Sequence, residues 1–384
     1  MCLARPPFLA GLSSILEAAL PFRILVINPG STSTKLSIFE DRTSVTAETI
    51  SHDAATIAQF VSLMDQLPMR LAIVKDFLTR HSTAVVDLSA IACRGGLLRP
   101  LPSGTYRVDE TMVHDLHEPI LGAHASNLAA CIGFELSKES GVPAFIVDPV
   151  VVDELSPLAR LSGLKGLDRV SIFHALNQKA VARQAAADLG KTYEEANLIV
   201  VHLGGGISVG AHHLGRVIDV NNALNGDGPF APERAGSLPA VGLVKLCFSG
   251  AYSQPEMMKL LAGKGGLVSH LGTNDARTVE KMIDDGDEHA LLVYTAMAYT
   301  VAKTIGEMAT VLKGDVDAIV VTGGIARSTF LVDEITRRVQ FIAPVKVYPG
   351  EDEMKALALG VLRVLDGSVP AGVYSPEQAG SERS

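Results

Sequence analysis

Residues 23–40 read RILVINPGSTSTKLSIFE, and this stretch decides the fold of the first half of the chain. Four strand formers (24–27) enter it, and an alternating apolar run leaves it after Lys35, so the pattern predicts strand, tight turn, strand. The turn offers glycine N–H groups, hydroxyls and one cation, all suited to a phosphate. An ordinary polar hairpin is the alternative, and the GxxxxGK[ST] spacing is absent. The candidate residues of this turn are Asn28, Gly30, Ser31, Ser33 and Lys35.

The same pattern returns at residues 198–210, LIVVHLGGGISVG. A shift of 174 positions (202 − 28) places Asn28 on His202 and Gly30 on Gly204, and residues 216–220 supply a third strand as 44–48 do. A glycine run alone is weak evidence, and GxGxxG spacing is missing. Two copies of one hairpin nevertheless predict two similarly folded lobes that face one nucleotide. The second turn adds the candidates His202, Gly204, Gly205 and Gly206.

Three further strands end in residues suited to chemistry. Arg94 follows the buried strand 85–93 and precedes a glycine pair that would let a ligand approach the backbone. Asp148 ends the strand 143–148, where metal–phosphate sites of α/β folds lie, although Asp before Pro equally starts a turn. Gly323 and Gly324 end the strand 317–322 and precede a helix whose N-terminus favours an anion.

Helical patterns cover 55–80, most of 110–140, an alanine-rich stretch from near His174 to Leu189, 354–366 and most of 255–313, with a glycine-rich break at 263–272. His174 falls near a helix start, where it could equally be a core residue. The loop 221–240 contains apolar residues that argue against disorder, so Arg234 within it is a second candidate cation.

Composition narrows the class of protein. A length of 384 residues suggests about two domains, and the formal charge of -9 argues against a nucleic-acid surface. The four cysteines are scattered, without the spacing of a metal site or of a disulfide framework. The sequence contains no apolar run of 18 residues, so no membrane span is expected. We therefore expect a cytoplasmic protein with reduced thiols. Disordered or weakly structured tails are expected at 1–21 and 367–384.

Three blocks of sequence resemble the butyrate kinases, in the acetate kinase branch of the sugar kinase, heat-shock chaperone and actin superfamily. The blocks are NPGSTSTK at 28–35, the long segment 202–239, and VTGGIARS at 321–328. The resemblance implies an α/β fold of two ribonuclease-H-like (actin-like ATPase) lobes, each a mixed sheet flanked by helices, with ATP between them. It places the first lobe at 22–147 plus 354–366 and the second at 148–353.

The resemblance also implies an activity: phosphorylation of a short-chain fatty acid, butyrate first, using ATP/ADP and Mg²⁺, in a homo-oligomer. Asn28 and the 30–35 loop would belong to the phosphoryl-transfer site, and Arg94 and Arg234 would hold the carboxylate and the phosphoryl group. Asp148 and Glu353 would bind the metal, with Glu351 and Asp352 competing for the second place. His202 and the 204–206 loop would form the second phosphate loop, and Gly323 and Gly324 the adenosine site.

The sequence departs from acetate kinases at several of these positions. Their phosphate-site helix carries a second histidine where this chain has Gln178, which leaves His174 as the retained imidazole. Different residues also follow Arg234 and Gly324. A branched-chain fatty acid, propionate or acetate kinase is the nearest alternative. A more remote one is an actin-like or chaperone-like ATPase switch that takes no carboxylate.

Overall fold

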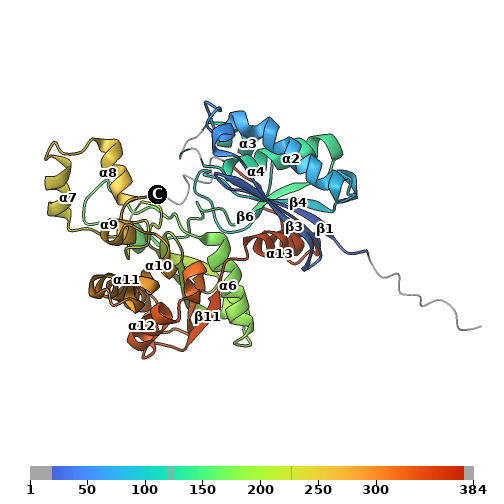
Figure 1. Cartoon of the computed structure of the whole chain (residues 1–384). Helices are drawn as coiled ribbons and strands as arrows, with labels where there is room; N and C mark the ends of the chain where they lie inside the picture. Colours follow the sequence, from blue (N-terminus) through green and yellow to red (C-terminus); the bar gives the residue numbers. More distant parts are fainter. Residues whose placement is uncertain (1–19, 119–121, 123, 226, 376–384) are drawn as a thin grey trace, which may run out of the picture.

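The computed structural model describes residues 20–118, 122, 124–225 and 227–375, which form two mixed sheets with helices on both faces (Figure 1). The first sheet has the strand order β3-β2-β1-β4-β6-β5. In it β1 pairs antiparallel with β2 and parallel with β4, and β4 pairs parallel with β6. Its strands are β1 (Arg23–Pro29), β2 (Ser33–Glu40), β3 (Thr43–Ser51), β4 (Ala90–Arg94), β5 (Thr105–Arg107) and β6 (Ala144–Val147).

The second sheet repeats this pairing in the order β11-β10-β7-β8-β9. β7 pairs antiparallel with β8 and parallel with β10, which is the arrangement of β1 with β2 and β4. The predicted repeat of the hairpin is therefore confirmed. Its strands are β7 (Asn197–Leu203), β8 (Ile207–His213), β9 (Arg216–Val220), β10 (Ala318–Gly323) and β11 (Val345–Pro349).

Strand alternation sends side chains to two separate cores in each half. Leu25 and Ile27 face a core that includes residues of α2 (Leu67–Arg80), α3 (Glu110–His117) and α4 (Asn127–Ser140), whereas Ile24 and Val26 face α13 (Glu353–Leu365). In the second sheet the corresponding faces pack on α11 (Glu288–Val311) with α12 (Thr329–Val339), and on α6 (Ala175–Ala187).

Helices α6 and α13 contact each other between the two sheets, which places the start of each helix at the junction of the halves (Figure 1). The shorter helices are α1 (Ala54–Ile57), α5 (Pro157–Arg160), α7 (Ala240–Cys247), α8 (Gln254–Leu261), α9 (Gly266–Leu271) and α10 (Ala276–Asp284), with 3-10 turns at 64–66, 85–87, 193–195 and 324–327.

One predicted helix is shorter than the sequence pattern suggests. The helix expected over 55–80 breaks after α1, because Ser62 and Asp65 exchange capping hydrogen bonds and Pro68 opens α2. Residues 110–140, expected to be mostly helical, form α3 and α4. The helix expected to start near His174 begins at Ala175, and before it Arg169 is held by the Ala159 and Val220 carbonyls and by Asp219. Residues 85–87 form a 3-10 turn rather than strand.

The C-terminal segment also corrects an expectation. Residues 367–375, predicted to be disordered, return to the first sheet, where Gly372 exchanges backbone hydrogen bonds with Thr105 and Arg107. The ring of Tyr374 is buried, and its hydroxyl donates to Asp115 at 2.7 Å. Residues 376–384, and residues 1–19 of the expected N-terminal tail, lie outside the described residues.

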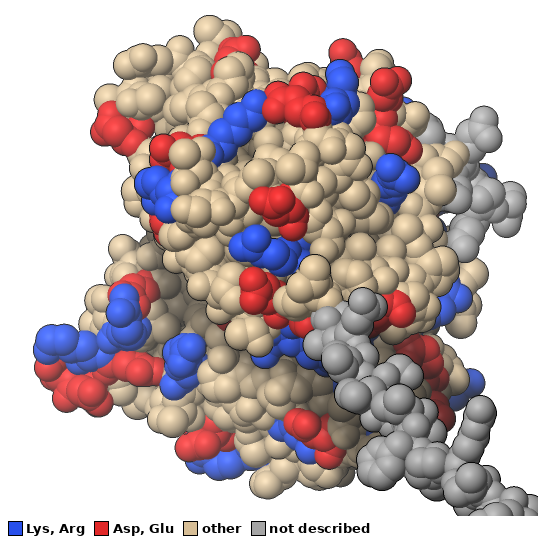
Figure 2. All heavy atoms as spheres, turned by 90° about the vertical axis from the view of Figure 1, so that its right-hand side faces the viewer, with Lys and Arg blue, Asp and Glu red and all other residues tan. Residues whose placement is uncertain are grey.

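The surface carries both signs of charge. On the face in Figure 2, lysine and arginine side chains alternate with acidic ones without a field of one sign. None of the helices in the described ranges is long and apolar enough to cross a membrane.

Candidate active site

A pocket lies at the junction of the two halves, and its titratable lining residues come from five different elements. Arg94 ends β4, Asp148 follows β6, His174 precedes α6, His202 lies on β7 and Glu353 begins α13. Five sequence candidates are thereby brought together. The pocket also has an apolar wall. The remaining lining residues are Gly95, Val147, Pro149, Val150, Ala175, Leu176 and Asn177.

The first hairpin contributes through Asn28, near the end of β1. Its Nδ2 donates to Glu353 Oε2 at 2.8 Å, and Lys35 lies opposite it in the β1–β2 register with its side chain exposed. The Gly30 N–H donates to the Ser33 carbonyl at 2.8 Å within the turn. The turn therefore offers Lys35 and its outer hydroxyls to solvent, while the Gly30 amide is already used.

A residue that the sequence did not suggest holds this turn in place. Arg70 of α2 is completely buried, and it donates to the carbonyls of Ser31 and Ser33 at 3.2 and 3.1 Å and to Gln66 and Thr34. Burial lowers the pKa of this guanidinium. An arginine on the apolar face of the predicted helix was the available signal.

The structure separates the roles of three neighbouring acids. Glu353 is paired with Arg94 through Oε1 and with Asn28 through Oε2, so it alone of the three bridges to the first sheet's strand ends. Asp352 caps α13 by accepting from the Lys355 N–H at 3.1 Å. Glu351 Oε1 lies 3.1 Å from His202 Nε2, and this hydrogen bond lowers the pKa of Glu351.

Two imidazoles stack in the pocket. The rings of His174 and His202 have centroids 3.7 Å apart and planes inclined by 11°. His202 is engaged at both nitrogens, since Nδ1 lies 2.7 Å from Asn177 Oδ1. Burial lowers the pKa of His174 well below its usual value, and electrostatic interactions with His202, Arg94 and Arg234 act in the same direction. His174 is therefore neutral near pH 7.

Arg234 lies close enough to act on His174 electrostatically but is not among the residues that line the pocket with Arg94. Its Nε is buried and has no hydrogen-bond partner in the described structure. Its Nη1 makes only long contacts with Glu233, at 3.4 Å to the carbonyl and 3.6 Å to Oε2. A buried donor left free in this way fits a guanidinium that binds an anion.

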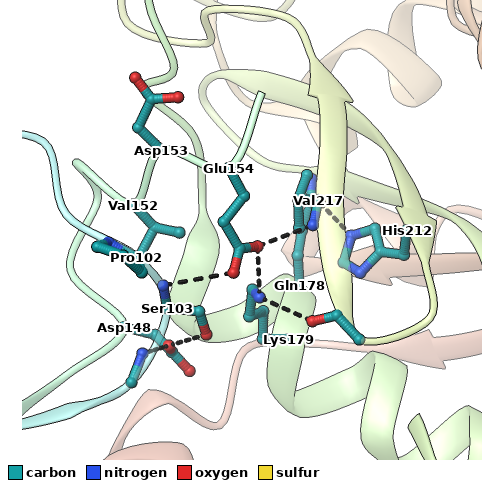
Figure 3. A network of polar contacts seen from close by, with 12 residues as sticks. Pro102, Ser103, Asp148, Val152, Asp153, Glu154, Gln178, Lys179, His212 and Val217 are labelled. Carbon is teal, nitrogen blue, oxygen red and sulfur yellow. Dashed lines mark hydrogen bonds and ion pairs between the residues drawn. The ribbon is translucent and has the colours of Figure 1, made fainter. Parts of the chain in front are cut away.

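Asp148 is fixed by the first half of the chain. Its Oδ1 accepts from the Ser103 hydroxyl at 2.6 Å and from the Gly104 N–H at 2.9 Å (Figure 3). From the second half, Arg183 of α6 lies 3.6 Å from Oδ2. Within the described ranges no cluster of three or more His, Cys, Asp or Glu residues could hold a metal. Two carboxylates on one pocket still fit Mg²⁺, which binds one or two carboxylates together with phosphates and water.

A buried ion pair lies behind Asp148 and was not predicted. Lys179 Nζ is 2.7 Å from Glu154 Oε2 with both side chains buried, and Glu154 also accepts from the N–H groups of Val217 and Ser103 (Figure 3). Ser103 in turn donates to Asp148. The pair thus connects the second sheet to the loop that orients Asp148.

The glycines of the candidate loops serve different purposes. At Gly323 φ is +96°, and a Cβ would lie 2.2 Å from the Leu203 carbonyl oxygen, so only glycine fits. Gly324 is exposed with open space around it, as an adenosine site requires. At Gly95 and Gly96 a Cβ would lie 2.4 Å from Pro149 and 2.5 Å from Asn127. This pair allows close packing, and Gly95 also lines the pocket beside Arg94.

Comparison with known proteins agrees with this architecture. Residues 165–348 match the acetokinase family. The structure is similar to an acetate kinase from Porphyromonas gingivalis, with a TM-score of 0.75 and 19% identity, over 90% of this chain and 100% of that one. It is also similar to a propionate kinase from Francisella tularensis subsp. tularensis SCHU S4, with a TM-score of 0.71 and 19% identity, over 88% and 98%. These likenesses show the predicted actin-like ATPase fold.

Proposed function

We propose that this chain, whose residues 165–348 match the acetokinase family, phosphorylates a short-chain carboxylate with ATP and takes butyrate as its preferred acceptor. In the reaction a carboxylate oxygen bonds to the γ-phosphorus while the bond from that phosphorus to the β,γ-bridging oxygen breaks. The products are the acyl phosphate and ADP, and the reverse reaction makes ATP. The resemblance of three sequence blocks to butyrate kinases supports the finer choice of acceptor.

The observation that carries the proposal is the balance of charged groups at the pocket. Arg94 lines it, the free Nε of Arg234 is close by, and both act on the neutral His174. Both carboxylates that line the pocket are engaged, because Asp148 accepts from Ser103 and Gly104 and Glu353 is paired with Arg94 and Asn28. Such a site lacks a free base for a sugar hydroxyl but suits an acceptor that is already an anion, because its task is to position and neutralise negative charge.

The residues divide the work as follows. Arg94 and Arg234 hold the acceptor carboxylate and the moving phosphoryl group, and Asn28 with the 30–35 turn lies beside the phosphoryl group. His202 and the 204–206 loop face the nucleotide phosphates, with Gly323 and Gly324 at the adenosine. Asp148 and Glu353 would hold Mg²⁺, which neutralises phosphate charge when bound.

The apolar wall formed by Pro149, Val150 and Leu176 supports an acyl chain longer than that of acetate. Initial rates with Mg-ATP should be measured for acetate, propionate, butyrate, isobutyrate and valerate. The proposal expects the highest kcat/KM for butyrate, with ~1–3 kcal/mol of discrimination per methylene. If kcat/KM is higher for acetate than for butyrate, the preferred acceptor is acetate and the choice of butyrate is wrong. ATP turnover that is independent of every carboxylate would refute carboxylate kinase activity.

A homo-oligomer and a cytoplasmic location belong to the same proposal. The apolar face of α11 is buried in the core of the second half, so this helix offers little oligomer surface. The exposed apolar side chains of α7, among them Val241 and Val244, with Phe248 just after it, are a better candidate surface. Light scattering of the wild-type chain and of Phe248→Asp would test this: a dimer that dissociates in the variant is expected.

A further inference from the structure

The position where acetate kinases carry a second histidine is occupied here by Gln178, whose side chain is completely buried in α6. It belongs to a hydrogen-bonded chain that starts at the pocket and runs into the second half. The links are His174 Nδ1 with Ser208 Oγ at 2.9 Å, Ser208 Oγ with Gln178 Nε2 at 2.8 Å, Gln178 Oε1 with His212 Nε2 at 2.9 Å, and His212 Nδ1 with Tyr193 Oη at 2.8 Å.

The direction of this chain follows from one backbone atom. The Ser208 carbonyl oxygen lies 3.1 Å from Gln178 Nε2, and a carbonyl can only accept, so the atom facing it is the amide nitrogen. Gln178 Oε1 must then accept from His212 Nε2–H (Figure 3). Burial lowers the pKa of His212 well below its usual value, so its neutral ring accepts at Nδ1 from the Tyr193 hydroxyl.

At the other end the same logic reaches His174. The Gln178 amide donates to the Ser208 hydroxyl oxygen, and Ser208 is completely buried. Of the described residues, His174 Nδ1 is the acceptor left for the hydroxyl hydrogen, and a buried hydroxyl that failed to donate would cost stability. Ser208 therefore donates to Nδ1. The proton of a neutral His174 is then on Nε2.

We propose that Gln178 is a positioning residue that fixes His174 as the Nε2–H tautomer, so that a neutral imidazole offers a hydrogen-bond donor to the anionic reacting groups. The inference rests on the proposed function for the identity of those groups, but the tautomer does not depend on it. His174 lines the pocket together with Arg94. Its Nε2–H group would therefore give a bound anion a directional hydrogen bond without adding a positive charge. A histidine at position 178 has no side-chain amide, so it could not fix the direction of the hydrogen bonds in this way.

The test uses the full chain labelled with ¹⁵N-histidine, whose 11 histidines are resolved by two-bond ¹H–¹⁵N correlation at pH 7. The His174 signal is identified by its loss in His174→Gln. We expect the Nε2-protonated pattern in the wild type. In Gln178→Glu the carboxylate can only accept, so the Ser208 hydroxyl turns toward it and His174 shifts toward the Nδ1-protonated form. Ser208→Ala should give a mixture of tautomers.

Gln184→Glu is the matched control, because it makes the same charge change on an exposed position of the same helix. With the proposed substrates, Gln178→Glu should lower kcat about 10²-fold, as for a lost transition-state donor, and change the acceptor KM less than about threefold.

An Nδ1-protonated or doubly protonated His174 in the wild type would overturn the inference. So would an unchanged tautomer in both Gln178→Glu and Ser208→Ala. If Gln178→Glu does not fold, the His174 tautomer in the wild-type and Ser208→Ala spectra tests the inference. Absence of carboxylate kinase activity alongside the expected spectra would reject the proposed function alone.

Discussion

Replacing Lys179 by methionine should destabilise the protein strongly. The Lys179 Nζ lies 2.7 Å from Glu154 Oε2, with side-chain exposures of 0% and 7%, and it also donates to the Gly215 carbonyl at 3.2 Å. Methionine fills the space but leaves the Glu154 carboxylate buried, with only the Val217 N–H at 2.8 Å and the Ser103 N–H at 3.4 Å. Removing one partner of a buried ion pair costs ~3–5 kcal/mol.

The double variant Glu154→Gln/Lys179→Met distinguishes a lost charge partner from lost packing. The glutamine amide keeps an oxygen for the Val217 N–H, and neither member of the pair carries a charge. We expect the free energy of unfolding of the double variant to exceed that of Lys179→Met by at least ~1 kcal/mol, because residues in contact are energetically coupled. Urea unfolding should be followed by far-UV circular dichroism, since the chain contains no tryptophan.

Lys281→Met provides the control. Its pair with Asp285 on α10 is exposed, and such i,i+4 pairs contribute ~0.3–0.5 kcal/mol. Ser103 contacts both Glu154 and Asp148, so its loop should loosen when the ion pair is lost. As a second measurement, amide hydrogen exchange at residues 103 and 104 should be faster in Lys179→Met than in the wild type. The reasoning is refuted if Lys179→Met loses less than ~1 kcal/mol, or if the double variant loses the sum of the two single variants.

Three further outcomes are expected. Arg94→Ala and Arg234→Ala should each lower kcat on the order of 10²-fold in the carboxylate kinase assay, and losses below about threefold in both would remove them from the site. Asp148→Asn should weaken the Mg²⁺ dependence of the rate, so an unchanged metal titration would count against its role. His174 and His212 have pKa values lowered from 6.5, so the unfolded chain binds more protons as the pH falls through that value. The free energy of unfolding should then decrease from about pH 7 to pH 5, by up to ~1.4 kcal/mol per pH unit for each imidazole, and a smaller slope in His212→Asn by urea titration would verify it.

The repeated hairpin was predictable because its signals are local. Strand formers, a glycine turn and a second alternating run sit within 20 residues of sequence in each copy, and the two sheets have matching strand pairings. The long segment 202–239 likewise identified Arg234 as a candidate. The helix expected over 55–80 was too long, because its apolar periodicity continues across residues 62–66, where Ser62 and Asp65 exchange capping hydrogen bonds.

Groups that act through tertiary contacts were beyond the sequence. Glu351, Asp352 and Glu353 are consecutive, and only the start of α13 decides that Glu353 reaches Arg94 and Glu351 reaches His202. Lys179 and Arg70 looked like ordinary helix cations. Their complete burial follows from packing against segments 25 or more positions away.

The electrostatics of the pocket explain why a neutral histidine belongs beside two arginines. Arg94 and Arg234 both disfavour a charged His174, and burial does so more strongly. An imidazolium there would add a third positive charge beside Arg94 and Arg234. A neutral ring avoids that cost, but it donates from only one nitrogen. The value of His174 to the proposed reaction therefore depends on which nitrogen carries the proton, and that choice lies with Ser208 and Gln178.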